Sequence, residues 1–238
     1  MDLKEEAVLT CDPSEHWYYH SKAKAMLRYL GNYSSGQVLD VGAGSGLFSR
    51  EILHHTDAKE ALCIDTSYSI ERDEMVSAKP IRFRRDFEDN DADIVLMMDV
   101  LEHVNDDAGL LRDYVSKVSS GTRFFITVPA FEFMWSEHDD FLEHKRRYTL
   151  AQLESLVRDA GLGIEKGSYY FGLVFPLAFI DRMLSNILPR SDKSPHSHLK
   201  QHSRLVNSML AGICKLELPL IRLNRFAGLS VFCLAHKP

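Results

Sequence analysis

The stretch QVLDVGAGSGLF, residues 37–48, restricts the fold more than any other part of the sequence. Val38, Leu39 and Val41 form an apolar run typical of a buried parallel strand, and three glycines at alternate positions then interrupt it. Apolar residues return at helical spacing from Leu47 onward. The segment predicts a strand, a tight glycine turn and a helix, and such a turn offers exposed backbone to a ligand.

Two classes of ligand bind such a turn. A dinucleotide fingerprint, GxGxxG, places Gly or Ala where this chain has Leu47, and it does not need Asp40 at the strand end. With Asp40 included, the pattern D-V-G-A-G-S-G resembles the first motif of class I S-adenosylmethionine-dependent methyltransferases. The resemblance implies that Asp40, Gly42, Gly44 and Gly46 hold the methionine end of that cofactor. A NAD-dependent oxidoreductase and a glycine turn without a ligand are the alternatives.

The remaining apolar runs complete an α/β pattern. Helices are expected at 14–30, where Ser14 is the predicted N-cap, and at 149–162, while strands are expected at 38–41, 61–65, 81–85, 94–98, 122–128, 164–170 and 229–235. The prediction is a Rossmann-like, seven-stranded, mostly parallel sheet with helices on both faces and a helical insertion before the last strand. Residues 1–170 and 228–238 would form the cofactor-binding domain, and residues 171–227 the insertion.

Acidic and apolar residues follow several of the predicted strands. Asp65 ends the second strand, where a carboxylate can accept both hydroxyls of a ribose. Since parallel strands present their carboxyl ends to the ligand, the residues that follow them are candidates for the same site. By resemblance to the family, the predicted cofactor contacts at these strand ends are Asp65, Thr66, Asp86, Phe87, Met98 and Asp99. Phe87 has a core position as its alternative.

The opening segment HWYYHSKAK resembles the HWW-F-x-x-R opening of one bacterial branch of the family, the methyltransferase type 11/12-like branch. The resemblance implies that Trp17 and Tyr18 cover the cofactor and that Lys22 faces its carboxylate. Lysine lacks the bidentate fork of the arginine usual there. An amphipathic helix whose aromatic residues belong to the core is the alternative.

The loop 130–148 is too long and too polar for a plain connection, which indicates a binding role. His138 beside Asp139, and His144 beside Tyr148, are candidate catalytic pairs because a histidine with an orienting partner suits proton removal near neutral pH. His103 in the string DVLEHV is a further catalytic candidate.

The same loop carries Arg146 and Arg147, which could steer an anionic acceptor or pair with local acids. His138 and His144 are six positions apart, outside the spacing of a helical metal pair, so no metal is expected there. His198 and His202 have metal-pair spacing, but a solvated loop is the stronger interpretation.

The function predicted for the chain is in-line transfer of a methyl group from S-adenosylmethionine to an oxygen or nitrogen of a small-molecule or lipid-linked acceptor. A non-catalytic protein that binds S-adenosylmethionine or S-adenosylhomocysteine is the remaining alternative. The net charge of −6 argues against general nucleic-acid binding. The four cysteines lack paired spacing, and the first residues do not resemble a secretory signal, so a cytoplasmic location is expected. The protein is expected to be a monomer or a homodimer.

The insertion 171–227 is apolar and basic by turns. Residues 181–225 contain eight Lys or Arg but only three Asp or Glu. The apolar runs of the insertion are too short to cross a bilayer. The segment is therefore expected to be a lid over the acceptor, a dimer contact, or a surface that lies on the inner membrane face.

Overall fold

A computed structural model gives the fold of the chain, and it describes residues 12–31, 36–87, 91–187 and 203–238. One mixed sheet forms the centre. Its strands are β1 Gln37–Val41, β2 Glu60–Ile64, β3 Arg72–Val76, β4 Lys79–Arg84, β5 Ile94–Met98, β6 Arg123–Pro129, β7 Gly163–Tyr170 and β8 Ser230–His236. The sheet order is β3-β4-β2-β1-β5-β6-β8-β7. Strands β4, β2, β1, β5 and β6 are parallel neighbours, whereas β8 runs antiparallel to both β6 and β7.

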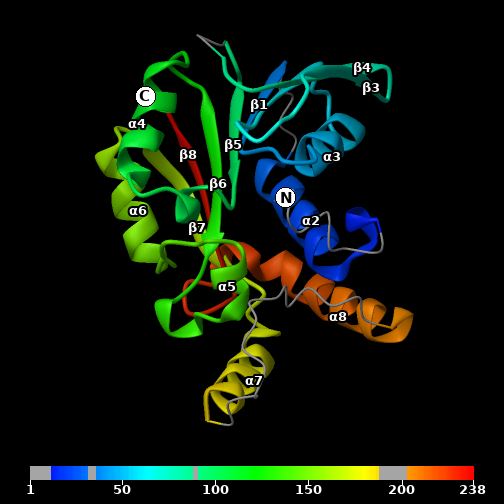
Figure 1. Cartoon of the computed structure of the whole chain (residues 1–238), viewed down its shortest axis with the longest axis vertical. Coiled ribbons are helices and arrows are strands. Elements are labelled where there is room, and N and C mark those ends of the chain that lie inside the picture. Colours follow the sequence, from blue (N-terminus) through cyan, green and yellow to red (C-terminus); the bar gives the residue numbers. More distant parts are fainter. Residues whose placement is uncertain (1–11, 32–35, 88–90, 188–202) are drawn as a thin grey trace.

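Helices cover both faces of the sheet, as Figure 1 shows. The helices are α2 Trp17–Leu30, α3 Leu47–His55, α4 Asp107–Ser116, α5 Glu137–Phe141, α6 Leu150–Asp159, α7 Phe175–Ile187 and α8 Arg204–Glu217, with short 3-10 turns η1 Pro13–Glu15, η2 Leu101–His103, η3 Glu132–Met134 and η4 Leu218–Leu223. One hydrophobic core lies under α2, α3 and α8, and a second lies under α4 and α6. The predicted Rossmann-like α/β architecture is confirmed.

The sheet has one strand more than the seven expected. The additional strand β3 pairs antiparallel with β4 along the edge of the sheet. Its sequence RDEMV is mostly charged and exposed, so it carries no apolar signal. The turn that joins the two strands places Ser77 and Ala78 at φ of 51° and 62°, without the Gly or Asn that usually marks such a hairpin.

The first helix begins later than predicted. Ser14 is not its N-cap, because the backbone N–H and hydroxyl of Ser14 both donate to Asp12, at 2.8 and 2.7 Å. Residues 13–15 instead form the 3-10 turn η1, and the extended backbone of His16 separates that turn from α2. The predicted end at Gly31 is confirmed, since Gly31 is the C-cap with φ of 64°.

The described parts of the segment between β7 and β8 are mostly helical and comprise α7, α8 and η4. Helix α8 packs on α2, where the side chain of Asn207 accepts from Trp17 N at 2.9 Å and donates to Glu15 O at 3.0 Å. The hydroxyl of Tyr170 donates to Cys214 O at 3.2 Å. The polar stretch 191–202, with His198 and His202, lies outside the described residues.

Candidate functional site

A cavity of about 490 Å³ opens at the carboxyl ends of β1, β2 and β5. Two of its walls come from the glycine turn and from the loop after β2, and a third comes from the loop after β5. The residues that line it are Gly42, Asp65, Ser67, Asp99, Val100, His103, Val104, Leu142, Glu143 and Lys145. The topology explains why these loops lie together, because neighbouring parallel strands end at one edge of the sheet. Among the predicted site residues, Gly42, Asp65, Asp99 and His103 line this cavity.

The glycine turn has a backbone that side chains would oppose. Gly42, Gly44 and Gly46 all have positive φ. A Cβ added to Gly42 would lie 2.8 Å from Val100 Cγ2, and one added to Gly46 would lie 2.9 Å from the ring of Phe83. Val100, which follows β5, and Phe83 of β4 lie so close to the turn that glycine is required at 42 and 46 for both conformation and space.

Asp65 is the carboxylate that faces the turn. Its Oδ2 accepts from Gly44 N at 3.0 Å, and its Oδ1 accepts from Ser67 N at 2.9 Å. The hydroxyl of Tyr68 donates to Gly44 O at 2.7 Å, which fixes the same peptide from its other side. The neighbouring side chain of Thr66 is exposed and does not line the cavity. Asp65 thus lies where a diol could compete for its two oxygens.

Asp40 is buried beneath the turn. Its carboxyl is 1% exposed and accepts from the hydroxyl of Ser49 at 2.8 Å. Burial raises the pKa of Asp40 to about 6. A buried carboxylate with one hydrogen bond is stabilised when a positive charge is placed near it.

Lys22 and Asp99 form an ion pair at the end of β5. The Lys22 side chain is fully buried and its ammonium contacts Asp99 Oδ2. Burial by itself lowers the pKa of Lys22, but the carboxylate of Asp99 outweighs it and the pKa is raised. Thr127 Oγ1 also donates to Asp99 at 3.1 Å, and Met98 beside it is buried. Lys22 therefore binds Asp99 here, a pairing that the sequence did not predict.

One buried polar atom of the opening helix and one of the turn have no hydrogen-bond partner among the described residues. They are Nε1 of Trp17 and the hydroxyl of Ser45. Trp17 is packed edge-on against Phe171, and Tyr18 stacks on Phe171 with ring centroids 4.9 Å apart. This packing agrees with the core alternative given for the opening helix, and the contact of Trp17 and Tyr18 with a cofactor stays a prediction. Ser45 was not predicted, although it is the polar residue between two glycines.

The predicted adenine contacts lie apart from this cavity. Phe87 stacks on Tyr114 of α4 with ring centroids 5.3 Å apart, and Asp86 is exposed. Neither residue lines the cavity. Their contact with a cofactor stays a prediction, and the core packing of Phe87 agrees with the alternative given for it.

The loop after β6 reaches back to the end of β5. Lys145 N donates to Glu102 O at 2.7 Å, which fixes this loop to η2. As a result, the rings of His103 and His144 meet at right angles with centroids 4.7 Å apart. The structure thus brings together two of the four predicted catalytic residues.

Asp139 organises this loop from a fully buried position. Arg147 donates to it through Nε at 2.7 Å and through Nη2 at 3.0 Å, and Nδ1 of His144 lies 2.9 Å from its Oδ1. Burial acts to raise the pKa of Asp139, but the hydrogen bonds from His144 and Arg147 outweigh it and hold the pKa below its usual range. Asp139 was expected to orient His138, but it is His144 that the structure pairs with it.

The other residues of the loop have structural partners. The hydroxyl of Tyr148 donates to Asp107 at 2.7 Å, and it lines a separate cavity of about 710 Å³ beside α6. Arg146 pairs with Asp107 and donates to the carbonyls of Val104 and Asn105. His138 lies on α5 and is not among the residues that line either cavity.

A family model described as a methyltransferase domain matches residues 14–166, more than half of the 238 residues. The chain belongs to the class I S-adenosylmethionine-dependent methyltransferases. Its cofactor is S-adenosylmethionine. This result excludes the NAD-dependent oxidoreductase. No curated protein matches the sequence.

Solved structures show the same fold for this methyltransferase at low sequence identity. A methyltransferase candidate of Haloferax volcanii, solved with the activator Trm112, is 17% identical, with a TM-score of 0.58 over 94% of this chain and 90% of the other. The [4+2]-cyclase SpnF is 15% identical, with a TM-score of 0.57 over 96% and 85%. Phosphoethanolamine N-methyltransferase 2 of Haemonchus contortus is 18% identical, with a TM-score of 0.54 over 91% and 52%. At such low identities the likeness shows the fold alone.

The methyltransferase site also contains Glu102, which its place in the string DVLEHV predicted to face either the cofactor or the opening helix. Glu102 is fully buried, and neither of its carboxyl oxygens has a hydrogen-bond partner among the described residues. Burial, with the nearby charge of Asp99, raises the pKa of Glu102 well above its usual range. Its signal in the sequence is a carboxylate directly before His103, shortly after an entirely apolar strand.

Proposed function

We propose that this methyltransferase transfers the methyl group to an oxygen or nitrogen atom of a small-molecule or lipid-linked acceptor. The observation that carries the proposal is the single cavity in which the glycine turn and Asp65 on one side meet His103 on the other. The cofactor supplies an electrophilic methyl group, and the protein has to hold a nucleophile in line with it at about 3 Å.

Asp65 and the glycine turn are proposed to bind the nucleoside and methionine parts of the cofactor. The N–H of Gly44 and the carboxylate of Asp65 form one hydrogen-bonded unit at the cavity wall. Trp17 Nε1 and Ser45 Oγ are buried polar atoms that a polar ligand could satisfy, which removes the penalty of leaving them without a partner. Asp40 places negative charge beneath the turn, where it favours a positively charged ligand.

His103 and His144 are the residues proposed to assist the acceptor. His103 lines the cavity, and His144 touches its ring while Asp139 holds Nδ1 of His144. That arrangement leaves Nε2 of His144 as the nitrogen that can accept a proton. General-base assistance of this kind typically contributes about 10²- to 10⁴-fold to a rate. His138 and Tyr148 remain catalytic predictions without a place in the described cavity.

Replacing Asp65 with alanine is expected to weaken S-adenosylmethionine binding by about 10- to 100-fold. The replacement removes a charged acceptor, and each hydrogen bond to a charged group contributes roughly 1.5–3 kcal/mol. Isothermal titration of both proteins with the cofactor measures the change. The exposed carboxylate of Asp73, changed to alanine, is the control. An Asp65→Ala variant with undiminished affinity would contradict the proposed cofactor site.

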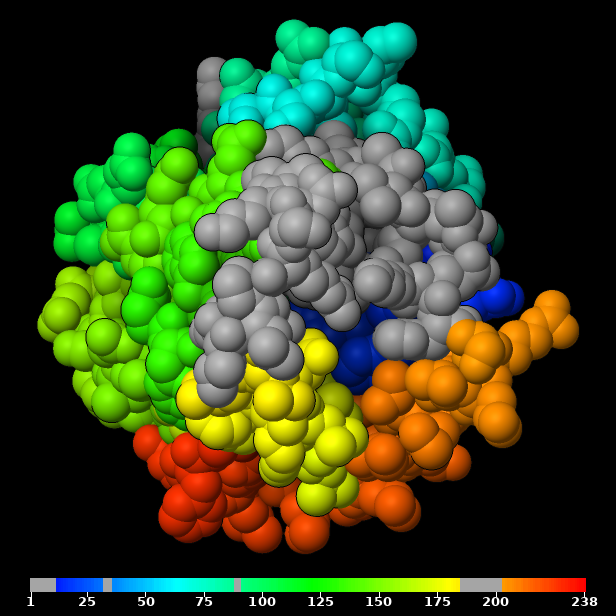
Figure 2. All heavy atoms as spheres, turned by 60° about the horizontal axis from the view of Figure 1, so that its bottom comes forward, coloured from blue at the N-terminus to red at the C-terminus, as the bar shows by residue number. Residues whose placement is uncertain are grey.

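The segment 171–227 is proposed to lie against a membrane surface when the acceptor is lipid-linked. Among the described residues, no helix is long and apolar enough to span a bilayer. Large apolar side chains are nevertheless exposed along this segment, namely Leu173, Leu177, Ile180, Met183, Leu184, Leu205, Met209, Leu216, Leu220, Leu223 and Phe226. Helices α7 and α8 both lie on the face that Figure 2 turns forward. A lid or a homodimer contact would bury the same side chains in a different way.

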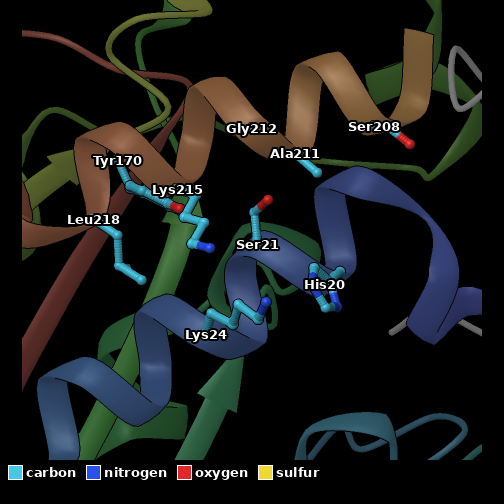
Figure 3. Close-up of a pocket in the computed structure, with 9 residues that line it drawn as sticks. All are labelled: His20, Ser21, Lys24, Tyr170, Ser208, Ala211, Gly212, Lys215 and Leu218. Atoms are coloured by element: carbon cyan, nitrogen blue, oxygen red, sulfur yellow. The ribbon is translucent and has the colours of Figure 1, made fainter. Parts of the chain in front are cut away.

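Positive charge accompanies this apolar surface. A cavity of about 300 Å³ lies between α2 and α8, and Figure 3 shows Lys24 and Lys215 on the two facing helices. His20 lines the same cavity, and burial together with Lys24 lowers its pKa. Two lysines on facing helices, beside exposed apolar residues, favour an anionic lipid surface over a neutral one.

The protein is expected to sediment with phosphatidylserine-containing vesicles and less with neutral phosphatidylcholine vesicles. Serine replacements of Leu216, Leu220 and Phe226 should reduce binding, because each removes apolar surface from the interface. Serine replacements of Ile70 and Met75 are the matched control, since these two are also exposed but lie near the edge strand β3. Binding that is absent, or equal in the two variants, would leave the lid or dimer interpretation.

A further inference from the structure

Three side chains that can bind a metal ion meet at the end of β5. Glu102, His103 and His144 each offer a ligand atom, and these atoms all lie within 4.8 Å of one another. Two come from η2 and the third from the loop after β6, so only the tertiary structure brings them together. They occupy one edge of the cofactor cavity, because His103 lines it.

Glu102 makes this more than a group of polar residues. Its side chain is fully buried, and both carboxyl oxygens lack a hydrogen-bond partner among the described residues. A buried carboxyl group without a partner carries a large desolvation cost. A bound cation is one physical means of removing that cost, because it supplies the charge and coordination that the surrounding protein does not.

His144 is oriented as metal-bound histidines are. Its Nδ1 lies 2.9 Å from Oδ1 of Asp139, which is ionised and held by both nitrogens of the Arg147 fork. An ionised carboxylate requires Nδ1 to be the donor, so Nε2 carries the lone pair. A carboxylate behind a ligating histidine fixes its tautomer and increases its basicity, and this is the usual second layer of a metal site.

We propose that Glu102, His103 and His144 bind one first-row transition-metal dication of the Zn²⁺, Fe²⁺ or Mn²⁺ type. Two imidazoles and one carboxylate suit these ions, whereas Mg²⁺ and Ca²⁺ prefer oxygen ligands. With bonds of about 2.0–2.1 Å, tetrahedral ligands lie about 3.3 Å apart, so no pair of ligand atoms has to approach by more than about 1.5 Å on binding. This proposal departs from the expectation of no metal, which was drawn from the spacing of His138 and His144, because the histidine beside His144 is His103.

Two of the positive charges that act on Glu102 are already paired, since Lys22 contacts Asp99 and Arg147 is engaged with Asp139. Lys145 also lines the cavity. The charge of Asp99 acts on Glu102, and Asp139 contacts His144, so a dication here has carboxylates near it in addition to Glu102. This distribution of charge favours a cation over an anion at this position.

Three protein ligands leave at least one coordination position, and His103 places it toward the cavity. On the proposed function, that position takes an acceptor oxygen. With Nε2 of His144 bound to the ion, the ion and not the histidine activates the acceptor, and a hydroxyl that binds the ion releases its proton to solvent. The oxygen then forms the new C–O bond as the C–S bond of the sulfonium breaks and a neutral thioether leaves. The acceptor class would accordingly be an alcohol, phenol or other oxygen nucleophile that can coordinate a metal.

The test is titration of the full-length, chelator-treated protein with ZnCl₂ and with MnCl₂ in separate calorimetric experiments. One ion per chain is expected. The variants Glu102→Gln and His144→Asn should each bind at least about tenfold more weakly, as loss of a metal contact requires. His55→Gln is the matched control, because His55 is an exposed histidine far along the chain from this group. Equal affinity of all four proteins, or the absence of binding to the wild type, would overturn the proposal.

A second measurement serves if a variant does not fold. Crystals of the wild type soaked in ZnCl₂ should show an anomalous peak about 2.0–2.2 Å from Nε2 of His144 and from a Glu102 oxygen. A peak elsewhere overturns the proposal. The binding experiments need no acceptor, so metal binding without methyl transfer would count against the proposed function and not against this site.

Discussion

The Asp139→Asn variant is expected to lose about 3–5 kcal/mol of unfolding free energy at neutral pH. The cause is the buried cluster that this carboxylate completes. Asp139 is 0% exposed and is bound by the fork of Arg147, while Nη1 of Arg182 lies 3.7 Å from its Oδ2. Removing the negative charge leaves Arg147 buried without an ionic partner, which is the costly way to break such a pair.

Urea denaturation of the wild type and the variant measures this loss. Asp140→Asn is the matched control, because Asp140 is adjacent in sequence but exposed, where it accepts from Trp135 Nε1 at 3.0 Å. The control should change stability by less than about 0.5 kcal/mol, as surface substitutions usually do. A loss under about 1 kcal/mol for Asp139→Asn would show that Asp139 does not hold the loop.

The Asp40→Asn variant is expected to be more stable than the wild type above pH 6, by up to roughly 3 kcal/mol. Burial raises the pKa of Asp40 to about 6 in the folded protein. The unfolded chain releases this proton near pH 4, so between about pH 4 and pH 6 the folded state binds more protons than the unfolded state. Stability of the wild type therefore falls as the pH rises through this window, and asparagine removes that fall.

Thermal unfolding at pH 4 and at pH 7, without added cofactor, gives the comparison. The two proteins should be similar at pH 4 and should differ at pH 7. Asp159→Asn, at an exposed position on α6, should show no pH-dependent gain. If Asp40→Asn were less stable than the wild type at pH 7, the carboxylate would be ionised and stabilised in the folded protein, contrary to this account.

The central part of the fold could be predicted because its signals are local. The apolar run before Gly42 and the helical spacing after Gly46 indicate a strand, a turn and a helix, and the structure has β1 and α3 there. The predicted N-cap Thr149 is likewise confirmed, since its hydroxyl and the side chain of Gln152 form a reciprocal capping box at the start of α6. Strand β3 was missed because an exposed edge strand of charged residues, joined by a Ser-Ala turn, carries neither signal.

Partner assignments among polar residues were less predictable. Adjacent residues suggested His138 with Asp139 and His144 with Tyr148, but Asp139 pairs with His144 and Arg147, and Tyr148 donates to Asp107. Lys22 was assigned to the cofactor, yet it binds Asp99, 77 positions further along the chain. Spacing along the chain cannot rank such contacts, because a buried ion pair forms between whichever opposite charges the packing brings together.

The amino-acid sequence by itself determined the methyltransferase class, the glycine turn and the acid that faces it. Those features depend on backbone conformation and on strand ends, which neighbouring residues specify. Only the tertiary structure decided which side chains lie together at the end of β5. The bond from Lys145 N to Glu102 O joins two loops, and that junction places His144 against His103. Desolvation then raises the pKa of Glu102, while hydrogen bonds from His144 and Arg147 lower that of Asp139, and both effects depend on the packing of the whole chain.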